Sequence, residues 1–63
     1  MNEQRRQDYL AMKAALTKIL ERLNDQIEFY PTHGDEEKYR DLTRKAIYYR
    51  NLIQQIDAAL NAD

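Results

Sequence analysis

Hydrophobic and aromatic residues recur along this chain at alternating intervals of three and four, in two segments separated by a short break. The first segment places these residues, and one glutamine, at the a and d positions of a heptad repeat: Tyr9, Met12, Leu16, Ile19, Leu23, Gln26 and Tyr30. The second segment fills the same positions with Tyr39, Leu42, Ala46, Tyr49, Ile53, Ile56 and Leu60. This spacing is typical of helices that pack lengthwise on one another. We therefore predict an all-α chain with one helix over about 3–30 and a second over about 35–61.

The break at Pro31-Thr32-His33-Gly34 holds the one proline and the one glycine of the sequence. Proline cannot donate a helical hydrogen bond and glycine can adopt a positive φ, so this segment predicts a turn over 31–34. Asp35 is the predicted N-cap of the second helix, followed by Glu36 and Glu37 in a first turn where the helix dipole favours negative charge. A cap at Thr32, with Asp35 reaching back to it, is the alternative.

The two heptad repeats match each other in length and phase. When the chain folds back at the turn, each seam residue of the first helix faces one of the second, which predicts an antiparallel, coiled-coil-like hairpin. One layer pairs the bulky Leu23 with the small Ala46. Lys13 and Asp57 face each other at one edge of the seam and are predicted to form an ion pair.

The chain has 63 residues, which is enough for one small domain of marginal stability. It contains no cysteine and one histidine, His33, which is predicted to be a turn residue. Disulfides, thiolate metal sites and a metal site built on several histidines are therefore excluded, and no metal or cofactor is expected. A second chain is the remaining common means of stabilising so small a scaffold.

Further apolar side chains lie beside the predicted seam, so the apolar stripe is wider than a two-stranded coiled coil needs. We expect the hairpin to assemble with copies of itself into a four-helix bundle or a higher homo-oligomer. The residues predicted to bind a partner protein are Leu20, Ile27, Ile47, Tyr48 and Leu52. Ala59 extends the same flank of the second helix.

The preferred functional hypothesis is a small non-enzymatic interaction or regulatory protein that binds a partner through these apolar flanks. In length and architecture the chain resembles small plasmid- and phage-encoded helical-hairpin proteins, which implies an accessory regulator or inhibitor. Catalysis is not expected, because the sequence contains no serine, no cysteine and no glycine-rich phosphate loop. A purely structural oligomerisation module is a further alternative.

The main alternative is binding of a nucleotide or of RNA phosphates by a basic and aromatic patch. Basic residues interleaved with an exposed aromatic ring can bind such ligands through charge and stacking. The residues in question are Lys18, Arg22, Arg40, Arg44, Lys45 and Arg50, with Tyr48 as the stacking ring.

The formal net charge is −1, which gives no overall field to attract nucleic acid or acidic lipid. The sequence shows no signal peptide and no apolar run of about 20 residues, the length that a transmembrane helix needs. We therefore expect a cytoplasmic protein with no membrane association.

Overall fold

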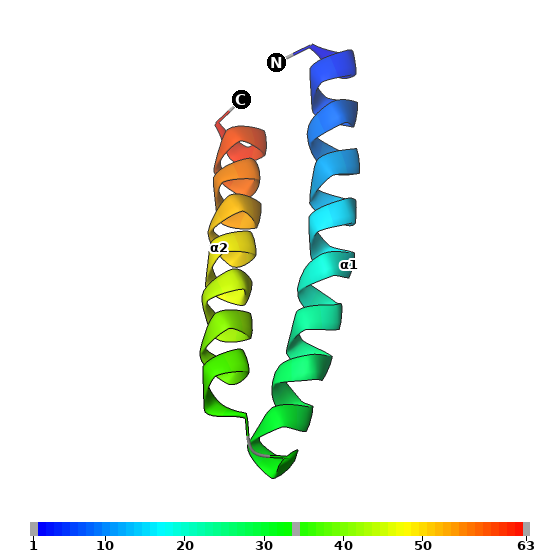
Figure 1. The fold of residues 1–63 in the computed structure, drawn as a ribbon. Helices are drawn as coiled ribbons and strands as arrows, with labels where there is room; N and C mark the ends of the chain where they lie inside the picture. The colour runs from blue at the N-terminus through cyan, green and yellow to red at the C-terminus, as the bar shows by residue number, and fades with distance from the viewer. Residues whose placement is uncertain (1, 34, 63) are drawn as a thin grey trace.

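The computed structural model describes residues 2–33 and 35–62, with side chains for residues 2–29 and 35–62. Its two helices are α1 (Glu3–His33) and α2 (Glu36–Asn61). The helices run antiparallel and side by side, so the start of α1 and the end of α2 lie at the same end of the molecule, which we call the open end (Figure 1). The opposite end is the turn end. The hairpin measures 47 × 15 × 12 Å, and the predicted all-α antiparallel hairpin is confirmed.

Side-chain caps fix where both helices begin. The Asn2 side chain accepts a hydrogen bond from the backbone N–H of Arg5 at 2.8 Å, at the start of α1. Asp35 has an extended backbone (φ −104°, ψ 96°), and its Oδ1 accepts from the N–H of Lys38 at 3.2 Å. Each cap satisfies a backbone donor that the first helical turn leaves unpaired. The prediction of Asp35 as the N-cap of α2 is confirmed.

The predicted turn over 31–34 begins too early, because α1 continues through Pro31 to His33. Proline holds φ near the helical value, and here it removes one backbone hydrogen bond close to the end of the helix, where the cost is smallest. Thr32 is thus part of α1 and is not the cap of α2. Gly34, which was expected to permit a positive φ in the turn, lies outside the described residues.

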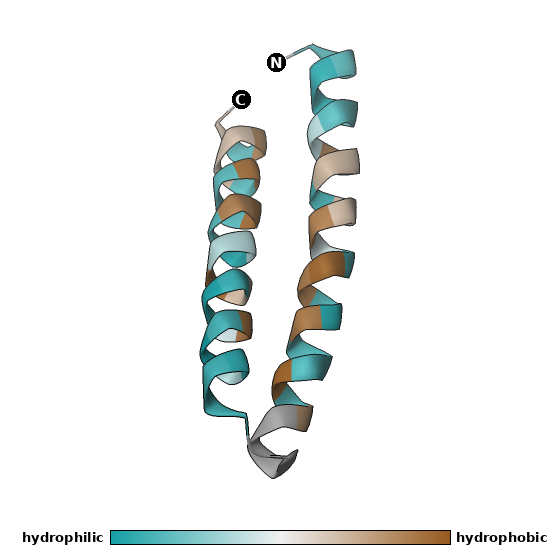
Figure 2. Ribbon diagram, viewed as in Figure 1, coloured by the Kyte–Doolittle hydropathy of each residue, from teal (hydrophilic) through white to brown (hydrophobic). Residues whose placement is uncertain are grey.

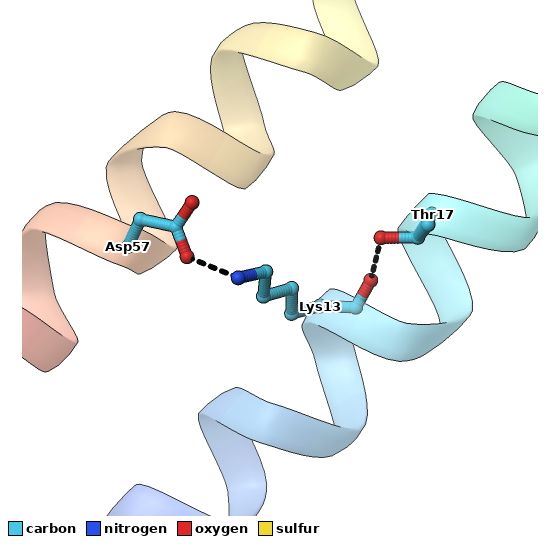
Figure 3. Close-up of polar contacts among 3 residues, drawn as sticks. All are labelled: Lys13, Thr17 and Asp57. Carbon is cyan, nitrogen blue, oxygen red and sulfur yellow. Dashed lines mark hydrogen bonds and ion pairs between the residues drawn. The ribbon is translucent and has the colours of Figure 1, made fainter.

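The described side chains form a small core between the two helices. Its buried residues are Leu23, Ala46 and Ile56, which are 9%, 4% and 6% exposed. The predicted ion pair between Lys13 and Asp57 is present, with 2.6 Å between Nζ and Oδ1 (Figure 3). This contact reports the register of the helices. Leu23 and Ala46, both buried, lie ten and eleven residues from it toward the turn end and so fall at nearly the same level, as the predicted layer requires.

The face that α1 turns toward α2 is rotated from the predicted seam. Met12 and Ile19 are 52% and 38% exposed although both were predicted at d positions of the seam, and Gln26 is exposed as well. Leu20 and Ile27, predicted as free flanks, are instead half-buried. An α-helix turns by about 100° per residue, so from an a position the next d lies about 60° to one side and the next e about 40° to the other. The interface of α1 is centred on its a and e positions from the first heptad on, since Met12, the first d residue, is already 52% exposed.

The seam of α2 agrees better with the prediction. Its residues are buried or half-buried, with the exception of Tyr39 beside the turn. The side chain of Tyr30, the predicted partner of Tyr39, lies outside the described residues. The two helices therefore contribute differently to the interface, and α1 leaves more apolar surface uncovered.

Candidate functional site

An apolar groove lies between the two helices on one side of the hairpin, toward the open end. It encloses about 510 Å³. Its lining comes from both helices and contains no charged residue: Tyr9, Met12, Ala15, Leu16, Leu52, Gln55, Ile56 and Ala59. Small residues such as Ala15 and Ala59 leave room that larger side chains would fill. A groove with this lining is suited to apolar side chains of another molecule rather than to a charged ligand.

A second, more polar groove lies nearer the turn end and is lined by Gln26, Phe29, Lys38, Asp41, Leu42 and Lys45. It opens on the same side of the hairpin as the apolar groove. Ala15 and Phe29 are two heptads apart on α1, and Lys45 and Leu52 are one heptad apart on α2, so each pair points in nearly the same direction. Ile19, one heptad after Met12, lies between the two grooves. We call this side of the hairpin, with both grooves and Ile19, the groove face.

The other side of the helix interface is bridged by an ion pair. Lys13 and Asp57 directly follow Met12 and Ile56 in the sequence, so they are turned by about 100° away from the apolar groove. Their ion pair crosses from α1 to α2, and the Thr17 hydroxyl donates to the backbone carbonyl of Lys13 at 2.7 Å (Figure 3). The two sides of the interface therefore differ, because a charged pair bridges one and the other is open and apolar.

Exposed apolar side chains are distributed unevenly along the groove face. Met12 and Ile19 on α1 expose much of their surface, and Phe29 near the turn end is 55% exposed. Hydrophobic residues are concentrated in the middle of α1 and the C-terminal half of α2, whereas the half of α2 next to the turn is mostly hydrophilic (Figure 2). The groove face is thus apolar toward the open end and mixed toward the turn end.

The five residues predicted to bind a partner protein do not lie on one surface. Leu20 and Ile27 are half-buried between the helices, and Leu52 lines the apolar groove. Ile47 and Tyr48 are both exposed on α2. Tyr48 lies one heptad from Asp41 and from Gln55, which line the two grooves, so it borders the groove face, whereas Ile47 does not. The heptad pattern predicts Met12 and Ile19 inside the seam and does not mark Phe29 as a partner-binding residue. The rotation of about 100° per residue, which places an e position nearer to a than a d position, is the signal that could have placed Met12 and Ile19 at an edge.

The basic residues proposed for anion binding are all exposed: Lys18, Arg22, Arg40, Arg44, Lys45 and Arg50. They are spread around the hairpin rather than directed at one point. Lys45 lines the polar groove beside Asp41, whereas Arg50 lies one heptad before Asp57 and therefore on the ion-pair side. The ring of Tyr48 makes an edge-on contact with Tyr49, with centroids 5.5 Å apart. Arg22, one heptad after Ala15, lies with Lys45 on the groove face, whereas Arg50 lies on the other side, so the six cations do not all share one surface.

Comparison of the chain with protein-family models, curated proteins and solved structures finds no match. Within residues 2–33 and 35–62, no helix is long and apolar enough to cross a membrane. The described side chains also include no cluster of three or more His, Cys, Asp or Glu residues that could hold a metal ion. The groove face is the feature of the hairpin from which a function can be argued.

Proposed function

We propose that this chain is a small non-enzymatic interaction protein that binds another helical chain along its groove face. The observation that carries the proposal is the accessible surface of the hairpin, which is 5066 Å². A compact folded chain of 7.6 kDa is expected to expose about 4300 Å². The excess of about 800 Å² matches the area that one partner loses in a standard protein–protein interface.

The position of the apolar surface supports the groove face as the binding site. The apolar groove and the exposed side chains of Met12 and Ile19 form a continuous strip along α1 and α2. A partner helix laid in this strip would bury apolar area worth about 25 cal/mol per Å², without having to neutralise a charged lining. The Lys13–Asp57 pair on the other side offers no comparable surface.

The test is the molar mass and thermal stability of the purified chain over about a hundred-fold range of concentration. If the hairpin depends on a partner, the chain associates or stays largely unfolded. Where it associates, its melting temperature rises with concentration, because binding to the folded state adds stability. Light scattering and circular dichroism melts measure both quantities. A folded monomer whose melting temperature is high and independent of concentration would refute the proposal.

A matched pair of variants locates the surface. Met12→Lys places a charge in the groove, whereas Leu10→Lys places it on the opposite side of α1, since two residues correspond to about 200° of helix rotation. Both side chains are exposed in the hairpin, at 52% and 40%. We expect Met12→Lys to abolish association and Leu10→Lys to preserve it. Equal effects of the two substitutions would place the binding surface elsewhere.

A further inference from the structure

We infer that the partner on the groove face is a second copy of this chain, lying antiparallel to the first, so that the turn end of each hairpin covers the open end of the other. This inference rests on the proposed function and deepens it by naming the partner and its orientation. The area agrees with a symmetric pair, because each copy has about 800 Å² to bury and a standard interface takes about 800 Å² from each partner.

Shape complementarity along the groove face supports the antiparallel orientation. Ile19 lies near the middle of α1 and on the groove face. If two antiparallel hairpins overlap along their whole length, the two-fold axis that relates them passes close to Ile19. Phe29 lies ten residues from Ile19 toward the turn end, and Tyr9 lies ten residues away toward the open end. The axis therefore brings the exposed ring of Phe29 to the level of Tyr9 in the second copy, beside the apolar groove that Ala59 helps to line. The exposed ring of Phe29 thus faces Tyr9 and the small residue Ala59 of the second copy.

One charge pair on the groove face favours the same orientation. The first turn of α2 also carries Glu36 and Glu37, but these residues line neither groove and take no part in this contact.

The charge pair follows from the same overlap. Lys38, in the polar groove, comes within about one residue of the level of Asp8 in the second copy. Asp8, which accepts a hydrogen bond from the Gln4 side chain at 3.0 Å, lies one heptad before Ala15 and therefore on the groove face. Lys45 lies at the level of Ala15 in the second copy. There its methylene groups can cover apolar surface while the ammonium group reaches water.

Spin-label distances test the orientation directly, because the chain contains no cysteine and a single introduced cysteine can be labelled selectively. Glu37→Cys places a label on the outer side of α2 at the turn end, and Ala58→Cys places one on the same helical line near the open end. With Glu37→Cys alone, an antiparallel pair gives a label separation of about 40 Å and a parallel pair about 25 Å or less. In a mixture of the two singly labelled chains, the distance runs from Glu37→Cys in one copy to Ala58→Cys in the other. This distance is the short one in an antiparallel pair and the long one in a parallel pair.

Substitution of the ring tests the proposed contact. By symmetry each Phe29→Glu change acts twice in a dimer, so we expect the dissociation constant to rise at least about a hundred-fold. Leu10→Glu, an exposed apolar residue of α1 away from the groove face, is the matched control and should leave the dissociation constant unchanged. Equal weakening by both variants would overturn the assignment of Phe29 to the interface.

The outcomes separate this inference from the proposed function. Short distances with Glu37→Cys alone would overturn the antiparallel pairing and leave the groove face as a binding site. A chain that stays unfolded and unassociated at every concentration would overturn self-association and still agree with dependence on a different partner. A stable monomer without intermolecular dipolar coupling would overturn both.

Discussion

Truncation of Leu23 to alanine is the sharpest test of the core. Leu23 is 9% exposed and shares a layer with Ala46, which is 4% exposed. Leu→Ala substitutions in protein cores cost about 2–5 kcal/mol, increasing with the volume of the cavity that remains. In a two-helix layer the helices can close in partly, so we expect a cost at the lower end, about 2–3 kcal/mol. For a domain of this size each kcal/mol lowers the melting temperature by about 4–8 °C, which predicts a fall of about 10–20 °C.

The assay is a circular dichroism melt at fixed protein concentration, with the molar mass checked by light scattering. Leu10→Ala is the control, because this exposed position should change the free energy of unfolding by no more than about 0.5 kcal/mol. A cost for Leu23→Ala as small as that of the control would refute the assignment of Leu23 to the core.

The layer pairing is tested by exchanging the two side chains. Ala46→Leu alone should cost about 1–3 kcal/mol, because it overfills a packed position. The double variant Leu23→Ala/Ala46→Leu keeps the total volume of the layer, so it should be more stable than the sum of the single changes predicts. An interaction energy near zero in this double-mutant cycle would show that the two residues do not share a layer.

The remaining predictions concern the cap, the ion pair and the groove. Asp35→Ala should lower the free energy of unfolding by about 1 kcal/mol in a denaturant titration, and a loss below about 0.3 kcal/mol would contradict its role as the N-cap. Asp57→Asn should cost less than about 1 kcal/mol, because both side chains of the ion pair are partly exposed. That cost should shrink at high salt, and a cost insensitive to salt would argue against an ion-pair contribution. Oxidation of Met12 by peroxide, followed by mass spectrometry, should slow as the chain associates, whereas a rate independent of concentration would place Met12 outside the interface.

Most of the fold could be predicted from the sequence because its determinants are local. The spacing of the a and d residues sets two amphipathic helices, and Asp35 marks where the second begins. Lys13 and Asp57 were predicted to pair from register alone, and the structure confirms the pair at 2.6 Å. Pro31 is the local signal from which the end of the first helix was placed too early. A proline near the end of a helix removes one hydrogen bond without ending the helix.

The groove face could not be predicted in the same way, because it depends on the rotation of α1 about its own axis. Whether Met12 and Ile19 or Leu20 and Ile27 face α2 is decided by the small difference between a period of 3.5 and one of 3.6. A heptad assignment assumes a period of 3.5 residues per turn, whereas two nearly straight helices have a period of 3.6. The predicted partner-binding set therefore included residues that the hairpin half-buries and omitted Phe29, whose side chain is exposed on the groove face.

The difference between the two sides of the hairpin also limits the assembly it can form. A stripe that was apolar on both sides of the helix interface would let each copy bind two others, and association would continue without closing. Here the Lys13–Asp57 pair occupies one side. Burying this pair against an apolar neighbour would cost more in desolvation free energy than the attraction between its charges would recover. The groove face is therefore the surface that we propose for the partner. A self-complementary patch used once by each copy closes at two chains, and two hairpins joined in this way form a four-helix bundle.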